Sequence, residues 1–145
     1  MANANPYAAY APAAPYFDLI RAALGSRVDG AHFFDVLAED VAYEVRYDIA
    51  GWPRIINGRT DLMAAFAAYV QGITLQSADH AIVHAAGDGR VLVVEYDVHG
   101  LIHASGASYD NRFCSVIGIV DRKVAWWRDY MDSLAAWTAL TSGRQ

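Results

Sequence analysis

Residues 90–131 read RVLVVEYDVHGLIHASGASYDNRFCSVIGIVDRKVAWWRDYM, and this stretch decides the fold. It contains three largely apolar runs with a period of two, at residues 90–99, 108–120 and 124–131. Turns rich in glycine or charged residues separate the three runs. The pattern predicts three long strands that are antiparallel neighbours in one sheet.

The segments before this stretch add further strands. Residues 75–85 predict a fourth long strand, which a turn at residues 87–89 links to the run at 90–99. Residues 41–47 predict another strand, and residues 55–56 form a short extended piece. The sheet is therefore expected to contain most of the second half of the chain and part of the first.

Helical spacing of apolar residues occurs in three places. Residues 17–24 predict a first helix, and residues 31–37 predict a short second one. A third helix is expected after Thr60 or Asp61, either of which can cap it. Its apolar stripe consists of Leu62, Phe66, Tyr69 and Val70. Helices followed by a run of antiparallel strands indicate an α+β fold, with the helices on one face of a curved sheet.

The composition indicates one globular domain. With 145 residues, a hydrophobic fraction of 55% and a charged fraction of 19%, the chain can bury a core and has no reason to be disordered. We expect residues 1–15 to form a flexible N-terminal arm and residues 16–145 to form a single domain.

Charge and cysteine content argue against several classes of function. The formal net charge is -5 and the eleven lysines and arginines are scattered, so no nucleic-acid partner is expected. Cys114 is the only cysteine, which rules out an intramolecular disulfide. No apolar run reaches the ~18 residues that span a bilayer, and the N-terminus lacks the basic residues of a secretory signal. We therefore expect a cytoplasmic protein without a membrane partner.

The last predicted strand contains the leading candidate for a catalytic residue. Alternation along the strand places Asp129 on the same face as Trp127 and Met131, and Arg128 and Tyr130 on the other face. If the Trp127 face is buried, burial disfavours the charged carboxylate, and a carboxyl group with a raised pKa can act as a general acid or base. The alternative is that Asp129 pairs with an arginine inside the sheet.

Four stretches of the chain, at residues 37–40, 55–59, 109–113 and 127–132, resemble the nuclear-transport-factor-2-like superfamily. Within it, the chain resembles the SnoaL-like and ketosteroid-isomerase-like enzymes. The resemblance implies a cone-shaped α+β barrel. In that fold, three N-terminal helices pack on a strongly curved, mixed and mostly antiparallel sheet.

The last strand resembles that of limonene-epoxide hydrolases, which end their sheet in a nearly identical Trp-Arg-Asp-Tyr run. The resemblance implies that Asp129 is a catalytic base that activates water, that Tyr43 helps to hold the water, and that Asp97 is a second catalytic aspartate. In those enzymes the two aspartates act through an intervening arginine. Glu95 stands at the position of that arginine here, and Val45 stands at the position of an asparagine that also holds the water.

A second group, the phenazine-biosynthesis A/B proteins, resembles residues 95–97, residues 109–113 and the last strand. There an acidic residue at the position of Asp129 acts in proton transfer. The catalytic base of the ketosteroid isomerases would fall at Val45, so their site is not carried over to this chain.

Glu95, Asp97 and His99 share one face of their predicted strand. If that face lines the same cavity as Asp129, the acids are close enough that at least one keeps its proton near neutral pH. The alternative is that they point to solvent or to a subunit interface, paired with Arg46, Arg112 or Arg128. The strand is apolar on both faces, so its pattern leaves the choice open.

A metal site and a cofactor are not expected. His80 and His84, like His99 and His103, are four residues apart, which on a strand separates the side chains by roughly 13 Å. The residues expected to bind substrate are instead His99, Trp127, Asn111, Met131, Trp52 and Phe66.

Together these features predict a cofactor-independent acid–base enzyme acting on a small apolar organic substrate. Isomerisation, cyclisation, dehydration and epoxide opening are the candidate reactions, with Asp129 as the central group and Glu95, Asp97 and Tyr43 beside it. A non-catalytic ligand-binding or dimerisation module of the same fold is the alternative. A homodimer is expected through the opposite, convex face of the sheet, formed by Arg112, Cys114, Val116, Arg128 and Tyr130.

Overall fold

The computed structural model describes residues 5–142, in which three α-helices pack on a six-stranded sheet. The helices are α1 (Ala14–Leu24), α2 (Arg59–Gly72) and α3 (Ser133–Thr141). The strands are β1 (Leu37–Val45), β2 (Ile55–Asn57), β3 (Ile73–Ala86), β4 (Val91–Ile102), β5 (Ser108–Val120) and β6 (Lys123–Met131). Two short 3-10 helices, Ala8–Ala13 and Gly25–Arg27, flank α1. Among the described residues, no helix is both long and apolar enough to cross a membrane.

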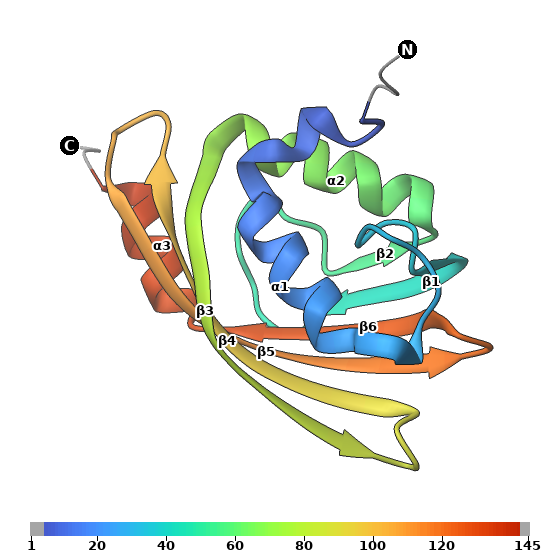
Figure 1. Ribbon diagram of the computed structural model, residues 1–145. Coiled ribbons are helices and arrows are strands. Elements are labelled where there is room, and N and C mark those ends of the chain that lie inside the picture. The colour runs from blue at the N-terminus through green and yellow to red at the C-terminus, as the bar shows by residue number, and fades with distance from the viewer. Residues whose placement is uncertain (1–4, 143–145) are drawn as a thin grey trace.

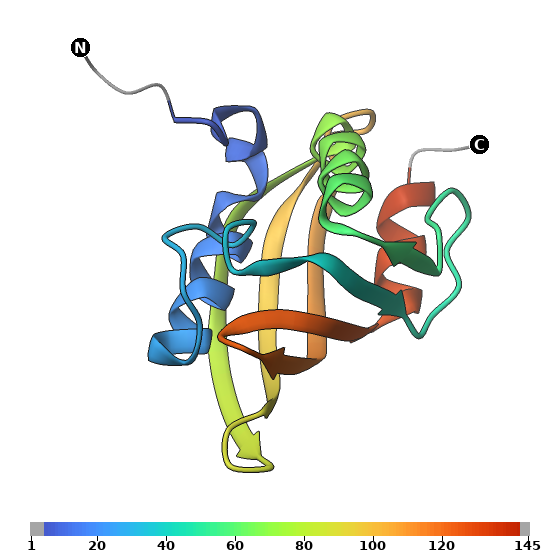
Figure 2. The same ribbon diagram turned by 90° about the vertical axis from the view of Figure 1, so that its right-hand side faces the viewer.

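The sheet is mixed, with strand order β2-β1-β6-β5-β4-β3. β1 and β6 run parallel, with Tyr43 opposite Trp127, and all other neighbours are antiparallel. The long strands curve strongly, and α1 and α2 lie over the concave side (Figures 1 and 2). The predicted α+β fold is confirmed.

The core fills the space between the concave side and the helices. Alternation along β4 turns Leu92, Val94, Tyr96 and Val98 inward, and each is at most 2% exposed. They face a cluster of rings from α1, α2 and the segment before β1. Its members are Phe17, Phe33, Phe34 and Phe66, whose ring centroids lie 4.9–5.9 Å apart. Burying each such side chain contributes about 1.5–3 kcal/mol, so this cluster fixes how the helices sit on the sheet.

The expected N-terminal arm differs from the structure. Residues 1–4 lie outside the described residues, but residues 5–15 pack against the domain. Ala13 is fully buried, the ring of Tyr7 stacks on His32 at 4.2 Å, and that of Tyr10 contacts Phe34 at 4.7 Å. Apolar and aromatic surface therefore orders a segment that the sequence composition suggested to be flexible.

Residues 31–36 form turns, so the predicted second helix is wrong. The backbone N–H of His32 donates to the Asp35 carboxylate at 3.1 Å, and the Nδ1 of His32 accepts from the N–H of Phe34. Such local side-chain bonds compete with helical hydrogen bonding. The next residue, Leu37, already begins β1, four residues before the predicted start.

The start of α2 and the position of the third helix also differ from the prediction. Gly58, with φ of 94°, is the N-cap of α2, so neither Thr60 nor Asp61 caps it. A third helix exists, but it is the C-terminal α3 and not a third N-terminal helix.

Candidate active site

A cavity of about 370 Å³ lies between the concave side of the sheet and the helices. Its lining comes from all three α-helices, from the loop after β1 and from β1, β3, β4, β5 and β6. Most lining side chains are apolar or aromatic. Of the described residues that line the cavity, only Asp129 carries a charged side chain.

Asp129 occupies the middle of the sheet. On β6 it pairs with Ser115 of β5 on one side and with Val45 of β1 on the other. It is only 3% exposed. The Oγ of Ser115 donates to Oδ1 of Asp129 at 2.6 Å, and the Nε1 of Trp127 donates to the same oxygen at 3.1 Å. The hydroxyl of Tyr43 donates to Oδ2 at 3.4 Å, close to the limit for a hydrogen bond.

Burial raises the pKa of Asp129 to about 6, and its hydrogen bonds with Ser115, Trp127 and Tyr43 only partly oppose this effect. The hydrogen-bond partners of the carboxyl group are neutral. The alternative, an arginine paired with Asp129 inside the sheet, is therefore wrong. A carboxyl group with this pKa changes its protonation state close to neutral pH, as a general acid or base must.

A second layer of polar groups holds the carboxyl group in place. Ser115 is fully buried, and its Oγ lies 2.9 Å from the hydroxyl of Tyr96. Burial and the charge of Asp129 raise the pKa of Tyr43 and of Tyr96 well above the ordinary value. Both phenols therefore remain protonated donors near neutral pH.

Five of the six predicted substrate-binding residues lie at the cavity or behind it, in two groups. Trp52, Phe66 and Met131 line the cavity, as Tyr43 does. Trp127 and Asn111 lie behind it: Trp127 supports Asp129, while the Nδ2 of Asn111 donates to the hydroxyl of Tyr109 at 2.9 Å. They position lining residues and do not line the cavity themselves.

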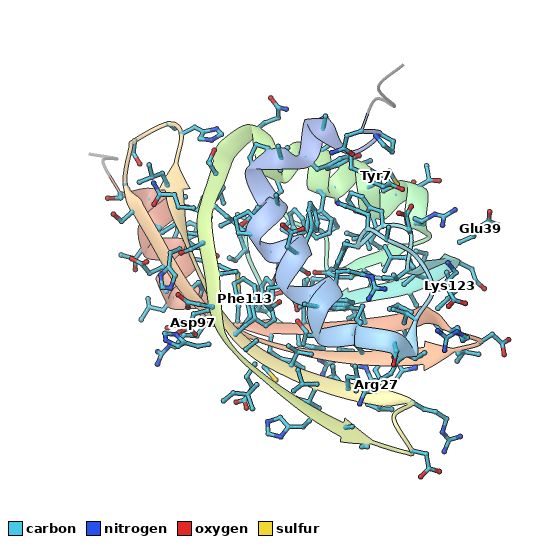
Figure 3. All side chains as sticks on the ribbon, in the orientation of Figure 1. Tyr7, Arg27, Glu39, Asp97, Phe113 and Lys123 are labelled. Atoms are coloured by element: carbon cyan, nitrogen blue, oxygen red, sulfur yellow. The ribbon has the colours of Figure 1, made fainter. Side chains whose placement is uncertain are left out.

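The predicted acid cluster around Asp129 is not formed. Glu95, Asp97 and His99 lie on the outer face of β4, because the buried residues of that strand occupy the inner face. Figure 3 shows Asp97 on the outer side of the strands, away from α1 and α2. Glu95 lies 2.9 Å from His84, and Asp97 lies 2.9 Å from His80. Their partners are histidines, not the arginines of the alternative interpretation.

His99 does not line the cavity either, so the prediction that it binds substrate there is wrong. It lies on the outer face, with its Nδ1 2.6 Å from Asp110 and its Nε2 3.2 Å from Asp79. The carboxylates of Asp110 and Asp79 raise the pKa of His99.

Asp79, Asp97 and His99 also have ligand-type atoms within 4.8 Å of one another. Spacing along one strand could not reveal this group, because its members come from two neighbouring strands. Both ring nitrogens of His99 are already occupied by carboxylate oxygens, and the Asp97 carboxylate by His80. Hydrogen bonds between His99 and Asp79, and from the group to His80 and Asp110, account for its geometry without an ion.

The sequence did not single out four tyrosines that line the cavity, Tyr16, Tyr47, Tyr69 and Tyr109. Burial is the main cause that raises the pKa of each. The sequence placed Tyr69 only in the apolar stripe of its helix and Tyr109 only in a stretch that carries the family resemblance; the count of nine tyrosines was the remaining signal. These four come from α1, the loop after β1, α2 and β5, so only the folded chain brings them together.

A family model described as the SnoaL-like domain matches residues 18–127, a span that ends two residues before Asp129. The uncharacterized protein YesE of Bacillus subtilis is 26% identical over 96 residues, which cover 66% of this chain and 65% of that protein. The match thus spans slightly less than two thirds of that relative's length.

Solved structures share the fold at low sequence identity. A Bacillus subtilis protein provisionally described as an isomerase has a TM-score of 0.72 and 20% identity, over 92% of this chain and 94% of that one. A phenazine biosynthesis-related protein from Pseudomonas aeruginosa has a TM-score of 0.65 and 21% identity, over 75% and 73% of the two chains. The expected nuclear-transport-factor-2-like fold is thereby confirmed.

Proposed function

Since this chain belongs to the SnoaL-like domain family, we propose that it is a cofactor-independent acid–base enzyme. The proposed reaction is isomerisation, cyclisation or dehydration of a small, largely apolar molecule bound in the Asp129 cavity. One observation carries the proposal: a carboxyl group with a pKa of about 6 is the only charged group among the described residues that line an apolar cavity.

The proposed reaction begins with proton removal by Asp129. Its Oδ2 takes a proton from a carbon next to a carbonyl group of the substrate and returns it to another carbon, or to a hydroxyl group that leaves as water. Ser115 and Trp127 hold Oδ1, which fixes the orientation of the carboxyl plane. The phenol of Tyr43 donates to Oδ2 at 3.4 Å before the reaction; once Oδ2 has taken up a proton, the phenol turns its own proton to the substrate oxygen that gains negative charge.

Epoxide hydrolysis by two linked aspartates is not part of the proposal. That mechanism requires Asp97 to reach Asp129 through a bridging group. Asp97 instead lies on the outer face, where its carboxylate is bonded to His80. The expectation that the two aspartates form one site is therefore corrected.

Non-catalytic ligand binding is the second candidate function. It is favoured by the fact that, among the described lining residues, Asp129 has no second carboxyl group, imidazole or amine beside it. Catalysis by Asp129 alone is sufficient only if one carboxyl group both removes and returns the proton. The two functions therefore differ in whether a bound ligand exchanges its carbon-bound protons.

The deciding experiment is deuterium exchange. A set of small apolar ketones and enones is incubated with the protein in D₂O, and loss of the proton signals next to the carbonyl is followed by NMR. We expect exchange with the wild type, and a rate lower by roughly 100-fold to 10,000-fold in Asp129→Asn, the range that a general base contributes. Glu95→Gln, which changes an acid on the outer face, is the matched control and should keep the wild-type rate. Ligands that bind without Asp129-dependent exchange would establish the binding function instead.

We also propose that the protein is a homodimer through the outer face of the sheet. This face carries half-buried Val116 and Trp126, with the guanidinium of Arg128 5.0 Å from the Trp126 ring centroid. Apolar side chains on both faces of a sheet favour cover on both sides.

A further inference from the structure

The charge of the cavity points to a narrower class of ligand. We propose that the cavity binds a molecule carrying a protonated or quaternary amine, with Asp129 as the counter-charge, aromatic rings around the amine, and an oxygen acceptor in the ligand facing Trp52. The inference rests on the proposed function only in assigning the ligand to the same cavity.

The first support is an uncompensated acid. No lysine, arginine or histidine is among the described residues that line the cavity, and the hydrogen bonds to Asp129 come from neutral groups. An ionised carboxylate that is buried without a positive partner is costly, by several kcal/mol. A cationic ligand supplies the missing partner, whereas carboxylate or phosphate ligands would be repelled.

The second support is the arrangement of three aromatic rings. Trp52, Phe66 and Tyr69 line the cavity, and their ring centroids lie 6.1–6.4 Å apart. Each pair of ring planes meets at 72–76°, so the three planes are close to mutually perpendicular. The face of an aromatic ring is electron-rich and attracts cations, and such groups of rings are the usual recognition site for quaternary ammonium.

The third support is an unused hydrogen-bond donor. The Nε1 of Trp52 is buried and has no hydrogen-bond partner among the described residues. A buried donor without an acceptor costs roughly 1–3 kcal/mol, so a ligand oxygen that accepts from it would be favoured. An amine that also carries a hydroxyl or carbonyl oxygen satisfies Trp52 and Asp129 together.

The test compares two probes of nearly the same shape, choline and 3,3-dimethylbutan-1-ol, which differ mainly in the positive charge. Binding is measured by calorimetry with the full chain at pH 8, where the Asp129 carboxylate is ionised. We expect choline to bind more tightly by on the order of tenfold. At pH 5, where Asp129 is protonated, the preference should shrink. Bound choline should also lower the pKa of Asp129, which NMR titration of its carboxyl carbon reports.

Variants assign the effect to the cavity. Trp52→Leu and Asp129→Asn should each remove most of the preference for choline. Trp137→Leu is the control for the first, because Trp137 is 50% exposed on α3 and does not line the cavity. Glu95→Gln is the control for the second. Both controls should keep the wild-type preference.

Two results would overturn the inference: equal or tighter binding of the neutral alcohol, and no binding of choline at millimolar concentrations. Either result leaves the proposed function standing if Asp129 still supports deuterium exchange into neutral ketones. Choline binding without any Asp129-dependent exchange would have the opposite meaning, since the ligand class would then hold and the enzyme assignment would fall.

Discussion

The two oxygens of the Asp129 carboxyl group have different surroundings. Oδ1 accepts two hydrogen bonds, one of them the 2.6 Å bond from Ser115, while Oδ2 has only the long contact with Tyr43. Hydrogen bonds to the ionised form favour that form. Ser115 therefore keeps the pKa of Asp129 from rising further, and Oδ2 is the oxygen left free to exchange a proton.

Replacing Ser115 by alanine tests this assignment. Ser115→Ala should raise the pKa of Asp129 above its value of about 6, because the bond that stabilises the carboxylate is lost. The free energy of unfolding should fall by about 1.5–3 kcal/mol at pH 8, the usual contribution of a hydrogen bond to a charged group. NMR titration and urea denaturation measure the two effects. Ser108→Ala, at an exposed position of β5, is the control; an unchanged or lowered pKa would contradict the assignment.

The raised pKa also makes a prediction for stability. Folding raises the pKa of Asp129 from 3.8 to about 6, so its protonated form is favoured in the folded state. The stabilisation of the folded state that comes from this pKa shift is complete below pH 3.8 and is lost as the pH rises through 6. At pH 8 its loss lowers the free energy of unfolding by roughly 3 kcal/mol.

Replacing Asp129 by asparagine tests this. The gain in the free energy of unfolding from Asp129→Asn should be larger at pH 8 than at pH 3 by about the same amount. Urea denaturation at the two pH values checks it, with Glu95→Gln as the control. A difference independent of pH would show that the carboxyl group is not perturbed.

At the level of single residues, strand alternation was enough to find Asp129 but not its neighbours. Trp127 and Met131 on the same face predicted a buried carboxyl group, and its burial is confirmed. The faces of β4 could not be told apart, because apolar residues occupy both, and so Glu95 and Asp97 were placed in the wrong environment. The inward residues are Leu92, Val94, Tyr96 and Val98, but only the packed helices reveal which side is inward.

At the scale of helices and strands, α3 follows directly after β6 and contributes side chains to the lining of the cavity. Asp132 follows the last strand, and its carboxylate accepts from the backbone N–H of Ala135 at 3.1 Å, which caps the helix. Ala136 and Leu140 of α3 line the cavity. The order of this helix therefore affects the shape of the ligand site.

Removing the cap should loosen α3. Asp132→Ala should lower the free energy of unfolding by about 1 kcal/mol, a usual value for the loss of a helix cap. Backbone amides of residues 135–140 should exchange faster, which hydrogen-exchange mass spectrometry measures. Asp48→Ala removes an acid whose side chain is 86% exposed and serves as the control. Unchanged exchange in α3 would mean that packing on β5, not the cap, holds the helix.

Helices were predicted correctly where apolar residues recur at helical spacing. The prediction failed at residues 31–37, where local side-chain hydrogen bonds compete with a helix, and at α3, whose apolar residues are not confined to one side. α1 and α2 were expected because large apolar residues recur in them at helical spacing: Phe17, Ile20 and Leu24 in α1, and Leu62, Phe66 and Val70 in α2. Residues 133–141 read SLAAWTALT, in which apolar residues occupy all sides, so no stripe marks a helix. The capping Asp132 was the one usable signal there.

The whole molecule should be a dimer if the outer face is an interface. Val116→Asp places a charge on that face and should convert a dimer into a monomer, as sedimentation equilibrium would show. Leu134→Asp makes the same change on α3, where Leu134 is 72% exposed, and should leave the dimer intact. A wild-type protein that sediments as a monomer would contradict the proposal.

The class of fold followed from the sequence, whereas the order of strands did not. Period-two runs predicted the antiparallel neighbours β3 to β6, which the structure confirms. The parallel contact of β1 with β6 joins segments far apart in the chain, and no local pattern encodes it. A mixed sheet was expected only from the resemblance to a known superfamily.

This parallel contact has a consequence for how the protein is made. Tyr43 and Asp129, which meet in the cavity, are 86 positions apart in the chain. Contacts between such distant segments form late in folding. On the ribosome, β1, α1 and α2 emerge before β6, the strand that joins the two halves of the sheet, and α3 follows β6. The strand that closes the sheet thus also carries Asp129, so a nascent chain completes its sheet and its candidate site in one late step.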